Sequence, residues 1–204
     1  MLSSADKEIR AGEVRLVLGS SSPRRRRLLA EDGYVFDILS PDADEVADAD
    51  DPAGSVLANA IAKNEACRRL RPDAVILSAD TLVWMAGRIF GKPADIDEAA
   101  EFLRALSGRN HTVFTAVAVS SPSMERPMSR IEASVVRFRT LDEAAIAAYI
   151  AKVRPLDRAG AYDISDYGDI VVERICGSYT CVVGLPMEAA RDLLGKAGAF
   201  PAKG

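Results

Sequence analysis

Short apolar runs alternate with amphipathic segments along most of this chain. The run at 14–19 predicts a buried strand, and Ser22 followed by Pro23 directly after it predicts the N-cap and first turn of a helix. Residues 54–70 carry apolar side chains at helical spacing and predict a second helix. The same patterns predict further helices over 95–108, 141–152 and 186–198, and further strands over 34–39, 112–120, 131–140, 169–175 and 178–184.

The stretch at 74–93 predicts a strand, an acidic break at Asp80 and then a hairpin around Ala86 and Gly87. Strands that alternate with helices indicate an α/β fold with helices flanking the sheet. We expect a flexible polar segment at 1–13, followed by one domain over 14–204 whose core is either compact or drawn out into two lobes.

The composition limits the kinds of ligand and partner that we expect this chain to bind. The 204 residues are 49% hydrophobic and 27% charged, which is ordinary for a globular protein. A formal net charge of -4 disfavours a general binder of nucleic acid, so we expect any anion site to be local. The three cysteines form no C-x-x-C pair, and we find no secretory signal and no bilayer-spanning run. These features favour a reduced, cytoplasmic setting without membrane contact.

A candidate anion site follows the first predicted strand. Where "GSSSPRR" enters the helix, free backbone N–H groups lie at the positive end of the helix dipole. The hydroxyls of Ser20 and Ser22 can donate to an anion there, and Arg24 and Arg25 can fold back over a phosphate. An ordinary capped helix with a basic surface explains the same residues equally well.

Lys63 and Asp80 each conflict with an apolar pattern. Lys63 falls on the apolar stripe of the helix at 54–70, so its ammonium either snorkels to solvent or meets a buried anion. Asp80 interrupts a buried run at the expected end of a strand. Because an unpaired buried carboxylate is costly, we expect a metal, a lysine or several donors beside it. Open α/β sheets bind ligands at such strand ends.

Acidic residues after the second predicted strand are candidate metal ligands. Asp42, Asp44 and Glu45 form either a solvated loop or, beside a phosphate site, part of the shell of a divalent ion. His111 is the chain's only histidine, so a metal would need oxygen ligands, which favours Mg²⁺ or Mn²⁺. We expect His111 itself to be structural. Together these features suit phosphoryl chemistry on a nucleotide.

Several segments resemble the Maf family of nucleoside triphosphate pyrophosphatases. "LVLGSSSPRRRRLL" is similar to the family's opening strand and S-x-S-P-R-R signature, and "NAIAKNEA" to its lysine-bearing helix. "SADTLVW", "FGKP" and "LSGRNH" resemble its A-D-T, G-K-P and L-S-G-R-x-H segments. The likeness runs in the same order from Val14 to Leu194. It implies an elongated mixed α/β sheet with flanking helices and a central cleft, related to the inosine triphosphate pyrophosphatases.

The resemblance also implies an activity. It is the metal-dependent hydrolysis of dTTP, UTP or modified pyrimidine nucleotides to the monophosphate and pyrophosphate. Asp80 is implied as the proton acceptor for the attacking water and, with Glu45, as a ligand of Mg²⁺ or Mn²⁺. The implied substrate contacts all face the cleft: Ser20, Ser22, Arg24, Arg25, Lys63, Thr81, Lys92 and Ser165. The family suggests a homodimer, and an alternative role is a nucleotide-binding regulator of septum formation or cell division without essential catalysis.

Two departures from the family pattern bear on base selectivity. Thr81 resembles the branch that takes dTTP and UTP, whose pattern has glutamine in "AYGIQ", whereas this chain reads "AYDIS" with Asp163 and Ser165. Serine cannot reach as far toward a base edge, so selectivity is expected to be altered or relaxed. Arg158 stands where lysine is usual in "PLDKAG", which retains the charge but changes the donor geometry.

Overall fold

The computed structural model describes residues 15–40 and 42–202, so the expected flexible segment at 1–13 lies outside the described residues. Within them a mixed sheet of seven strands forms the centre. The strands are β1 Leu16–Gly19, β2 Asp37–Ile38, β3 Val75–Met85, β4 Arg88–Phe90, β5 Asn110–Ser120, β6 Met128–Phe138 and β7 Val172–Cys176. The helices are α1 Pro23–Glu31, α2 Pro52–Leu70, α3 Ile96–Leu106, α4 Glu143–Lys152, α5 Gly168–Val171, α6 Tyr179–Val183 and α7 Met187–Lys196, with 3-10 turns η1 Pro155–Asp157 and η2 Ala159–Ala161.

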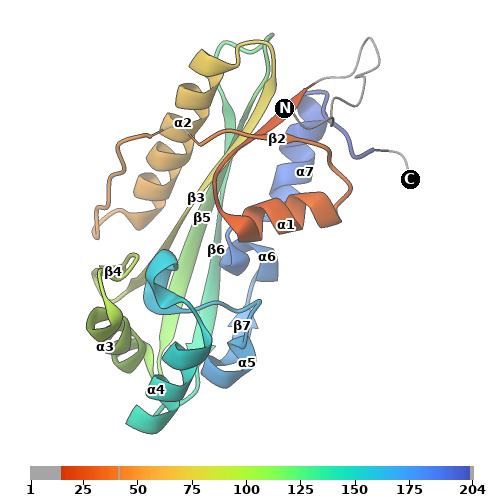
Figure 1. Ribbon diagram of the computed structural model, residues 1–204. Coiled ribbons are helices and arrows are strands. Elements are labelled where there is room, and N and C mark those ends of the chain that lie inside the picture. Colours follow the sequence, from red (N-terminus) through yellow and green to blue (C-terminus); the bar gives the residue numbers. More distant parts are fainter. Residues whose placement is uncertain (1–14, 41, 203–204) are drawn as a thin grey trace, which may run out of the picture.

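The strands β3, β5 and β6 run the length of the molecule (Figure 1). The strand order is β2-β1-β3-β5-β6-β7, with β4 paired to the far half of β3. β1 is parallel to β2 and β3, and the other pairs are antiparallel. The helix α2 lies on one side of the sheet and α1 and α7 on the other, while α3, α4 and α5 gather at the opposite end (Figure 1). The expected elongated mixed α/β sheet with flanking helices is confirmed.

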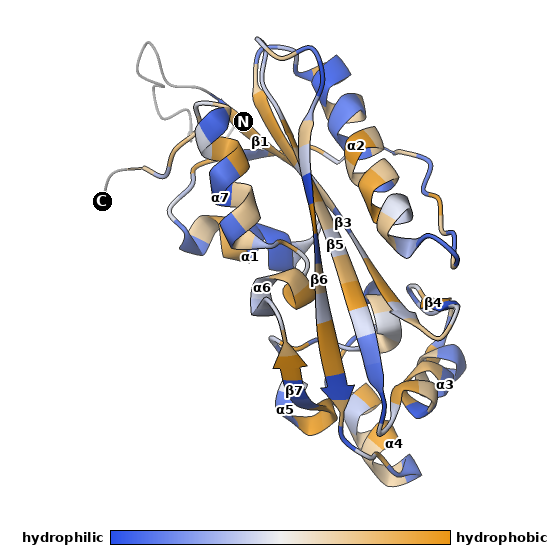
Figure 2. Cartoon of the chain, turned by 180° about the vertical axis from the view of Figure 1, so that it is seen from behind, coloured by the Kyte–Doolittle hydropathy of each residue, from blue (hydrophilic) through white to orange (hydrophobic). Residues whose placement is uncertain are grey.

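Each end of the sheet has its own buried cluster. At the upper end in Figure 1, Leu18, Leu77 and Leu194 join β1, β3 and α7. At the other end, Leu103, Phe138 and Tyr149 join α3, β6 and α4. Hydrophobic colours run along the central strands, while α2 and α7 carry mixed hydrophobic and hydrophilic turns (Figure 2), as helices with one buried side do. The middle of β3, between the two clusters, carries the buried polar residues Ser78 and Asp80.

Alternation along β3 sends successive side chains to opposite sides of the sheet. Ser78 and Asp80 bond to residues of α2, whereas Leu77 packs toward α7 and Thr81 bonds to Arg25 of α1. The acidic break expected at Asp80 was wrong. The strand continues to Met85, and Asp80 stays in register opposite Ala116 of β5. Backbone pairing with β5 and compensation of the charge by α2 let the strand continue through a carboxylate.

The segment 178–184, expected as a strand, is the helix α6, so that prediction was wrong. Ser178 Oγ accepts a hydrogen bond from the Cys181 backbone N–H at 3.1 Å as an N-cap. Gly184 ends the helix with a φ of 114°, in the region that favours glycine. Local capping therefore outweighs the strand propensity of the residues between the two caps.

Other boundaries shifted for related reasons. Only Asp37–Ile38 of the strand expected at 34–39 pairs with β1. The strand expected at 169–175 begins only at Val172, because the preceding residues form α5. Both ends of the helix expected at 95–108 are confirmed within two residues. Asp95 caps the start of this helix by accepting from the Glu98 N–H at 2.8 Å. None of the helices within the described ranges is long and apolar enough to span a bilayer.

His111 lies in the core beside Phe138 and Tyr162, consistent with a structural residue. Its Nε2 is 2.9 Å from the Tyr162 hydroxyl, and its ring packs edge-on to Phe138 at a centroid distance of 4.9 Å. The side chain is buried, with 2% of the residue exposed. Burial lowers the pKa of His111 from 6.5 to about 4, because the interior disfavours the imidazolium.

We expect His111 to make folding stability depend on pH. Between about pH 6.5 and 4 the unfolded chain binds a proton at this position and the folded chain does not, so the free energy of unfolding falls as the pH drops through this window. The loss should reach about 2–3 kcal/mol at pH 4. Urea unfolding of His111→Gln should show a shallower decrease over this range than the wild type. Equal decreases in the two proteins would contradict the assignment.

Candidate active site

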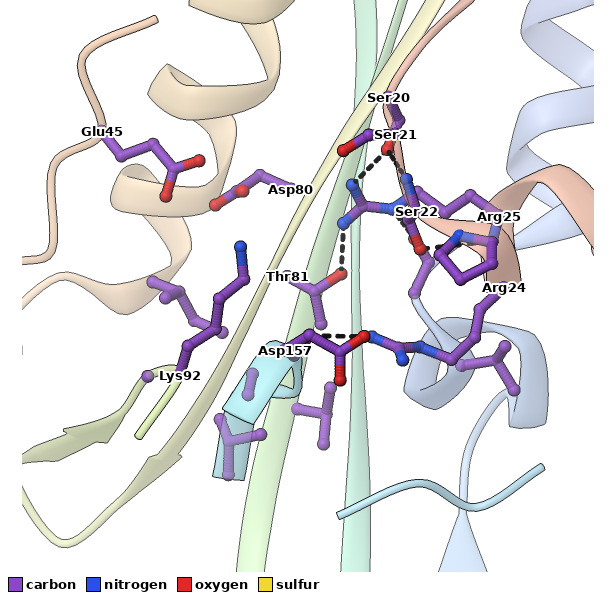
Figure 3. Close-up of a pocket in the computed structure, with 18 of the residues that line it drawn as sticks. Ser20, Ser21, Ser22, Arg24, Arg25, Glu45, Asp80, Thr81, Lys92 and Asp157 are labelled. Carbon is purple, nitrogen blue, oxygen red and sulfur yellow. Dashed lines mark hydrogen bonds between the residues drawn. The ribbon is translucent and has the colours of Figure 1, made fainter. Parts of the chain in front are cut away.

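A cavity of about 550 Å³ opens along one edge of β3. On that edge β1 pairs with β3 only as far as Ser78, and β4 pairs with it only from Val83. Asp80 and Thr81 lie in the gap between these two pairings, and both line the cavity (Figure 3). The sheet thus has an uncovered stretch of edge at Asp80 and Thr81, because no neighbouring strand pairs with β3 there.

The turn between β1 and α1, which we call the serine–arginine turn (residues 20–25), forms one wall of this cavity. Ser20 Oγ accepts from the Ser22 N–H at 3.2 Å, and Ser22 caps α1 by accepting weakly from the Arg25 N–H at 3.5 Å. The first turn of α1 holds no acidic residue, so its own side chains do not neutralise the positive end of the helix. The predicted anion site therefore has hydroxyls and amides facing a cavity.

Arg25 braces the serine–arginine turn against two other elements. Its Nη1 donates to Ser20 Oγ at 3.1 Å, its Nη2 to Thr81 Oγ1 at 3.0 Å and its Nε to the Gly184 carbonyl at 2.7 Å (Figure 3). Burial lowers the pKa of Arg25, and the nearby Asp80 carboxylate acts against this effect. Among the described residues these three acceptors occupy three of its N–H groups, so only the others remain for a phosphate.

The hydroxyl of Thr81 has a fixed direction. Thr115 Oγ1 donates to the Cys181 carbonyl at 2.8 Å, so in the 3.0 Å contact between the two threonine hydroxyls Thr81 is the donor. Thr81 also accepts from Arg25. Its remaining lone pair can only accept, and a ligand group that bonds to Thr81 must therefore bring a donor.

Replacing Arg25 by lysine should weaken this brace while keeping the charge. A lysine ammonium cannot reach Ser20, Thr81 and Gly184 together, because it lacks the forked geometry of the guanidinium. We expect the free energy of unfolding of Arg25→Lys to fall by about 1–2 kcal/mol in urea titrations. Arg26→Lys, one exposed position further along α1, is the matched control and should stay within about 0.5 kcal/mol of the wild type. Equal effects at the two positions would contradict the bracing role.

Glu45, Lys63 and Asp80, which we call the acid–cation cluster, meet across the cavity from the serine–arginine turn. Lys63 Nζ lies 2.6 Å from Asp80 Oδ1 and 2.7 Å from Glu45 Oε1. Asn59 Nδ2 donates to the other Asp80 oxygen, Oδ2, at 3.0 Å. Lys63 therefore meets a buried anion rather than snorkelling to solvent, and Asp80 has the lysine and further donor that its burial requires.

The electrostatics of the cluster favour an ionised Glu45. Burial raises the pKa of Glu45, but the hydrogen bond from Lys63 and the charges of Lys63, Lys92 and Arg25 outweigh it, so the pKa lies below its ordinary value. Figure 3 shows Lys92 reaching into the cavity from beyond β4 toward Glu45 and Asp80. Positive groups thus converge on the cavity from both walls.

Comparison with known proteins identifies the family. A family model described as "Maf-like protein" matches residues 15–197. The chain belongs to the Maf family. A "dTTP/UTP pyrophosphatase" of Shewanella oneidensis is 42% identical over 192 residues, which cover 90% of this chain and 98% of the relative. One of Aromatoleum aromaticum is also 42% identical, over 197 residues that cover 89% of this chain and 95% of the relative.

Among solved structures, "The structure of the Staphylococcus aureus Ham1 protein" aligns with this Maf protein at 15% sequence identity. The alignment covers 63% of this chain and 72% of the other, with a TM-score of 0.41.

The remaining predicted site residues of this Maf protein lie in different surroundings. Arg24 lines the cavity, where its Nη2 donates to the Asp157 carbonyl at 3.4 Å and its Nη1 lies 3.6 Å from Asp163 Oδ2. Ser165 lies outside the lining, and its hydroxyl donates to Asp163 Oδ1 at 2.6 Å. In this stretch the cavity is lined by Asp163 and its neighbours Tyr162 and Ile164 rather than by Ser165.

A divalent metal fits this Maf protein only if protein carboxylates and substrate phosphates together supply its ligands. Over residues 15–40 and 42–202, no group of three or more His, Cys, Asp or Glu side chains is arranged to hold an ion. Asp80 and Glu45 nevertheless place carboxylate oxygens around the ammonium of Lys63, and Asp42 lines the same cavity. Magnesium in phosphate-handling sites is held by one or two carboxylates together with substrate phosphates. The donor set suits that arrangement.

Sequence reasoning missed three residues that position the site. Asn59 precedes Lys63 by one helical turn on α2, and it holds both Asp80 and the backbone N–H and carbonyl of Val46. Its position on the same helix face as Lys63 was the available signal. Thr115 acts from β5 through its contacts with Thr81 and the Cys181 carbonyl, and Tyr149 acts from α4 through two bonds to the Asp163 backbone. No local pattern indicates these contacts.

Proposed function

We propose that this Maf protein hydrolyses dTTP and UTP between the α- and β-phosphates, releasing the nucleoside monophosphate and pyrophosphate. The observation that carries the proposal is the acid–cation cluster, which, with Lys92 in the same cavity, places a buried carboxylate and two lysines opposite the serine–arginine turn. The relatives named dTTP/UTP pyrophosphatase match about nine-tenths of the chain at 42% identity, which supports this substrate class.

The serine–arginine turn binds the phosphates in this proposal. The N–H groups at the start of α1 and the hydroxyls of Ser20 and Ser22 receive phosphate oxygens, with Arg24 and the free N–H groups of Arg25 above them. Lys63 and Lys92 add charge from the opposite wall. Fixed donors of this kind stabilise the charge that develops on phosphate oxygens without reorganising during the reaction.

Asp80 is the general base. Its carboxylate is held at one oxygen by Lys63 and at the other by Asn59, so its direction is set before substrate arrives. It accepts a proton from a water molecule whose oxygen attacks the α-phosphorus. The bond from that phosphorus to the bridging oxygen breaks, and pyrophosphate leaves with the charge that Lys63, Lys92 and the arginines compensate.

Asp80 and Glu45 would hold the Mg²⁺ or Mn²⁺ that we include in this proposal. When bound, such an ion would neutralise part of the charge on the phosphates. Lys63 contacts both carboxylates, so it holds them in place on either side of its ammonium.

The test is a panel of dTTP, UTP, CTP, ATP and GTP incubated with the protein and Mg²⁺ or Mn²⁺, with the products identified by anion-exchange chromatography. We expect pyrophosphate and the monophosphate, most rapidly from dTTP and UTP. Release of orthophosphate, or no turnover of any member with either metal, would contradict the proposal. The homodimer that the family resemblance implies stays a prediction, which light scattering at several protein concentrations measures.

A further inference from the structure

Part of the cavity lining is apolar, including a pair of valines beyond Asp80 along β3. This part of the lining comes from β3, β5, the segment after η1 and the end of α6: Val83, Val113, Ala159, Tyr162, Ile164 and Val182. One nearly completely buried carboxylate stands among these side chains in the described part of the chain, that of Asp163, whose side chain is 3% exposed. A flat apolar wall with few polar groups suits a nucleotide base, whose faces are apolar and whose edge carries donors and acceptors.

The position of Asp163 is tightly fixed. The Tyr149 hydroxyl accepts from the Asp163 N–H at 3.0 Å and donates to its carbonyl at 3.3 Å. Burial raises the pKa of Tyr149 to about 12, so this hydroxyl keeps its proton. The Ser165 N–H and hydroxyl both donate to Asp163 Oδ1, at 2.8 and 2.6 Å. Backbone and side chain of Asp163 are thus held from separate elements.

The other oxygen of Asp163 retains capacity for a ligand. Arg158 Nη1 forms an ion pair with Asp163 Oδ2 at 2.6 Å, which leaves one lone pair of that oxygen. Arg24 Nη1 lies 3.6 Å from the same oxygen, too far for a hydrogen bond. Because two donors already use Oδ1, Oδ2 is the oxygen that can accept from a ligand. Arg24 beside it supplies donors.

Among the pyrimidine bases, an acceptor beside a donor matches uracil and thymine. Uracil and thymine present N3–H next to a carbonyl, which is a donor next to an acceptor. Cytosine presents an unprotonated N3, an acceptor, at the same place. An amide side chain can rotate to serve either edge, whereas a carboxylate cannot donate, so a carboxylate facing N3 rejects cytosine through an unpaired buried acceptor.

We propose that Asp163, paired with Arg24 and held by Arg158 and Tyr149, is a specificity-determining residue that accepts N3–H of uracil or thymine. This inference rests on the proposed function. It replaces the expectation of relaxed selectivity at Ser165, because Ser165 serves to orient Asp163. A purely structural Asp163 would instead neutralise Arg158 and leave discrimination between bases unchanged.

The decisive variant is Asp163→Asn, with kcat/KM measured for UTP and CTP. The asparagine amide can rotate and donate to N3 of cytosine, so the ratio of kcat/KM for UTP over CTP should fall by about 10-fold or more. Asp157→Asn is the matched control, since it removes a carboxylate that also lines the cavity and contacts Arg158, with a side chain 60% exposed. Its ratio should change by less than about twofold. An unchanged ratio in an active Asp163→Asn variant would overturn the inference.

The wild-type protein provides a second test that does not depend on a variant folding. N3-methyl-UTP lacks the N3–H, whereas 5-methyl-UTP carries the same added methyl on another edge. We expect kcat/KM for N3-methyl-UTP to be lower than for UTP by about 10²-fold or more, and that for 5-methyl-UTP to stay within about 10-fold. Equal turnover of the two methylated nucleotides would overturn the role of Asp163. A wild type that releases pyrophosphate from no nucleotide would instead contradict the proposed function itself.

Discussion

The Asp80→Asn variant is expected to fold and to lose about 10²-fold or more of kcat/KM for dTTP and UTP. Asparagine has the size of aspartate and can still accept through its carbonyl oxygen, but it cannot take a proton from water. Lys63 keeps Glu45 as an ionic partner in this variant, so no cation is left buried alone. Initial rates of pyrophosphate release with Mg²⁺, alongside thermal unfolding, measure the effect.

The matched control for Asp80→Asn is Asp192→Asn. Asp192 also pairs with a lysine at 2.7 Å, Lys196, but on the exposed surface of α7. Such pairs contribute little, and we expect its rate to stay within about twofold of the wild type. A near-normal rate for Asp80→Asn would remove Asp80 as the base. If that variant lost turnover but kept nucleotide binding and an effect on septation, the alternative of a binding regulator would be favoured.

The Lys63→Met variant should also lose about 10²-fold of kcat/KM. Methionine has a similar length without the charge, so Asp80 and Glu45 would repel each other with no cation between them. The phosphates would also lose one of the positive groups that stabilise their developing charge. Rates of pyrophosphate release at saturating and at low substrate separate the effect on kcat from that on KM.

Stability and activity must be separated for Lys63→Met. Lys196→Met is the control, because it removes an exposed lysine from a pair of the same length, and we expect its rate and thermal midpoint to match the wild type. Lys63→Arg should recover part of the rate, since it restores the charge but not the shape of the ammonium. A lower thermal midpoint for Lys63→Met with an unchanged rate would show that Lys63 only supports the fold.

Local signals predicted the elements whose ends are fixed by neighbouring residues. Pro23 after Ser22 started α1, and the cap at Asp95 started α3, as predicted. Prediction failed where a local cap competed with strand propensity, as at Ser178 and Gly184 of α6. It also failed at Asp80, which interrupts an apolar run and was predicted to end the strand. The strand continued because β5 pairs with it and α2 compensates the charge.

The candidate site likewise contains residues that the sequence singles out and residues whose role only the fold reveals. Lys63 and Asp80 could be singled out from sequence because each breaks an apolar pattern, and burial of an unpaired charge is costly. Their pairing agrees with that reasoning. The bracing role of Arg25 could not be read, since it depends on acceptors from β3 and from the end of α6. The sequence likewise could not show that Asp163 rather than Ser165 lines the cavity, because this depends on how the chain turns after η2.

By itself the sequence determined the α/β layering, the cap that starts α1 and the inventory of charges, because periodicity, caps and composition act over a few neighbouring residues. Only the tertiary structure decided which charges meet and which face the cavity. Glu45, Lys63 and Asp80 come from a loop, a helix and a strand, and their contacts exist only once α2 packs on the sheet beside the uncovered edge of β3. Packing of distant segments sets distances, and distances set the electrostatics on which the proposed chemistry depends.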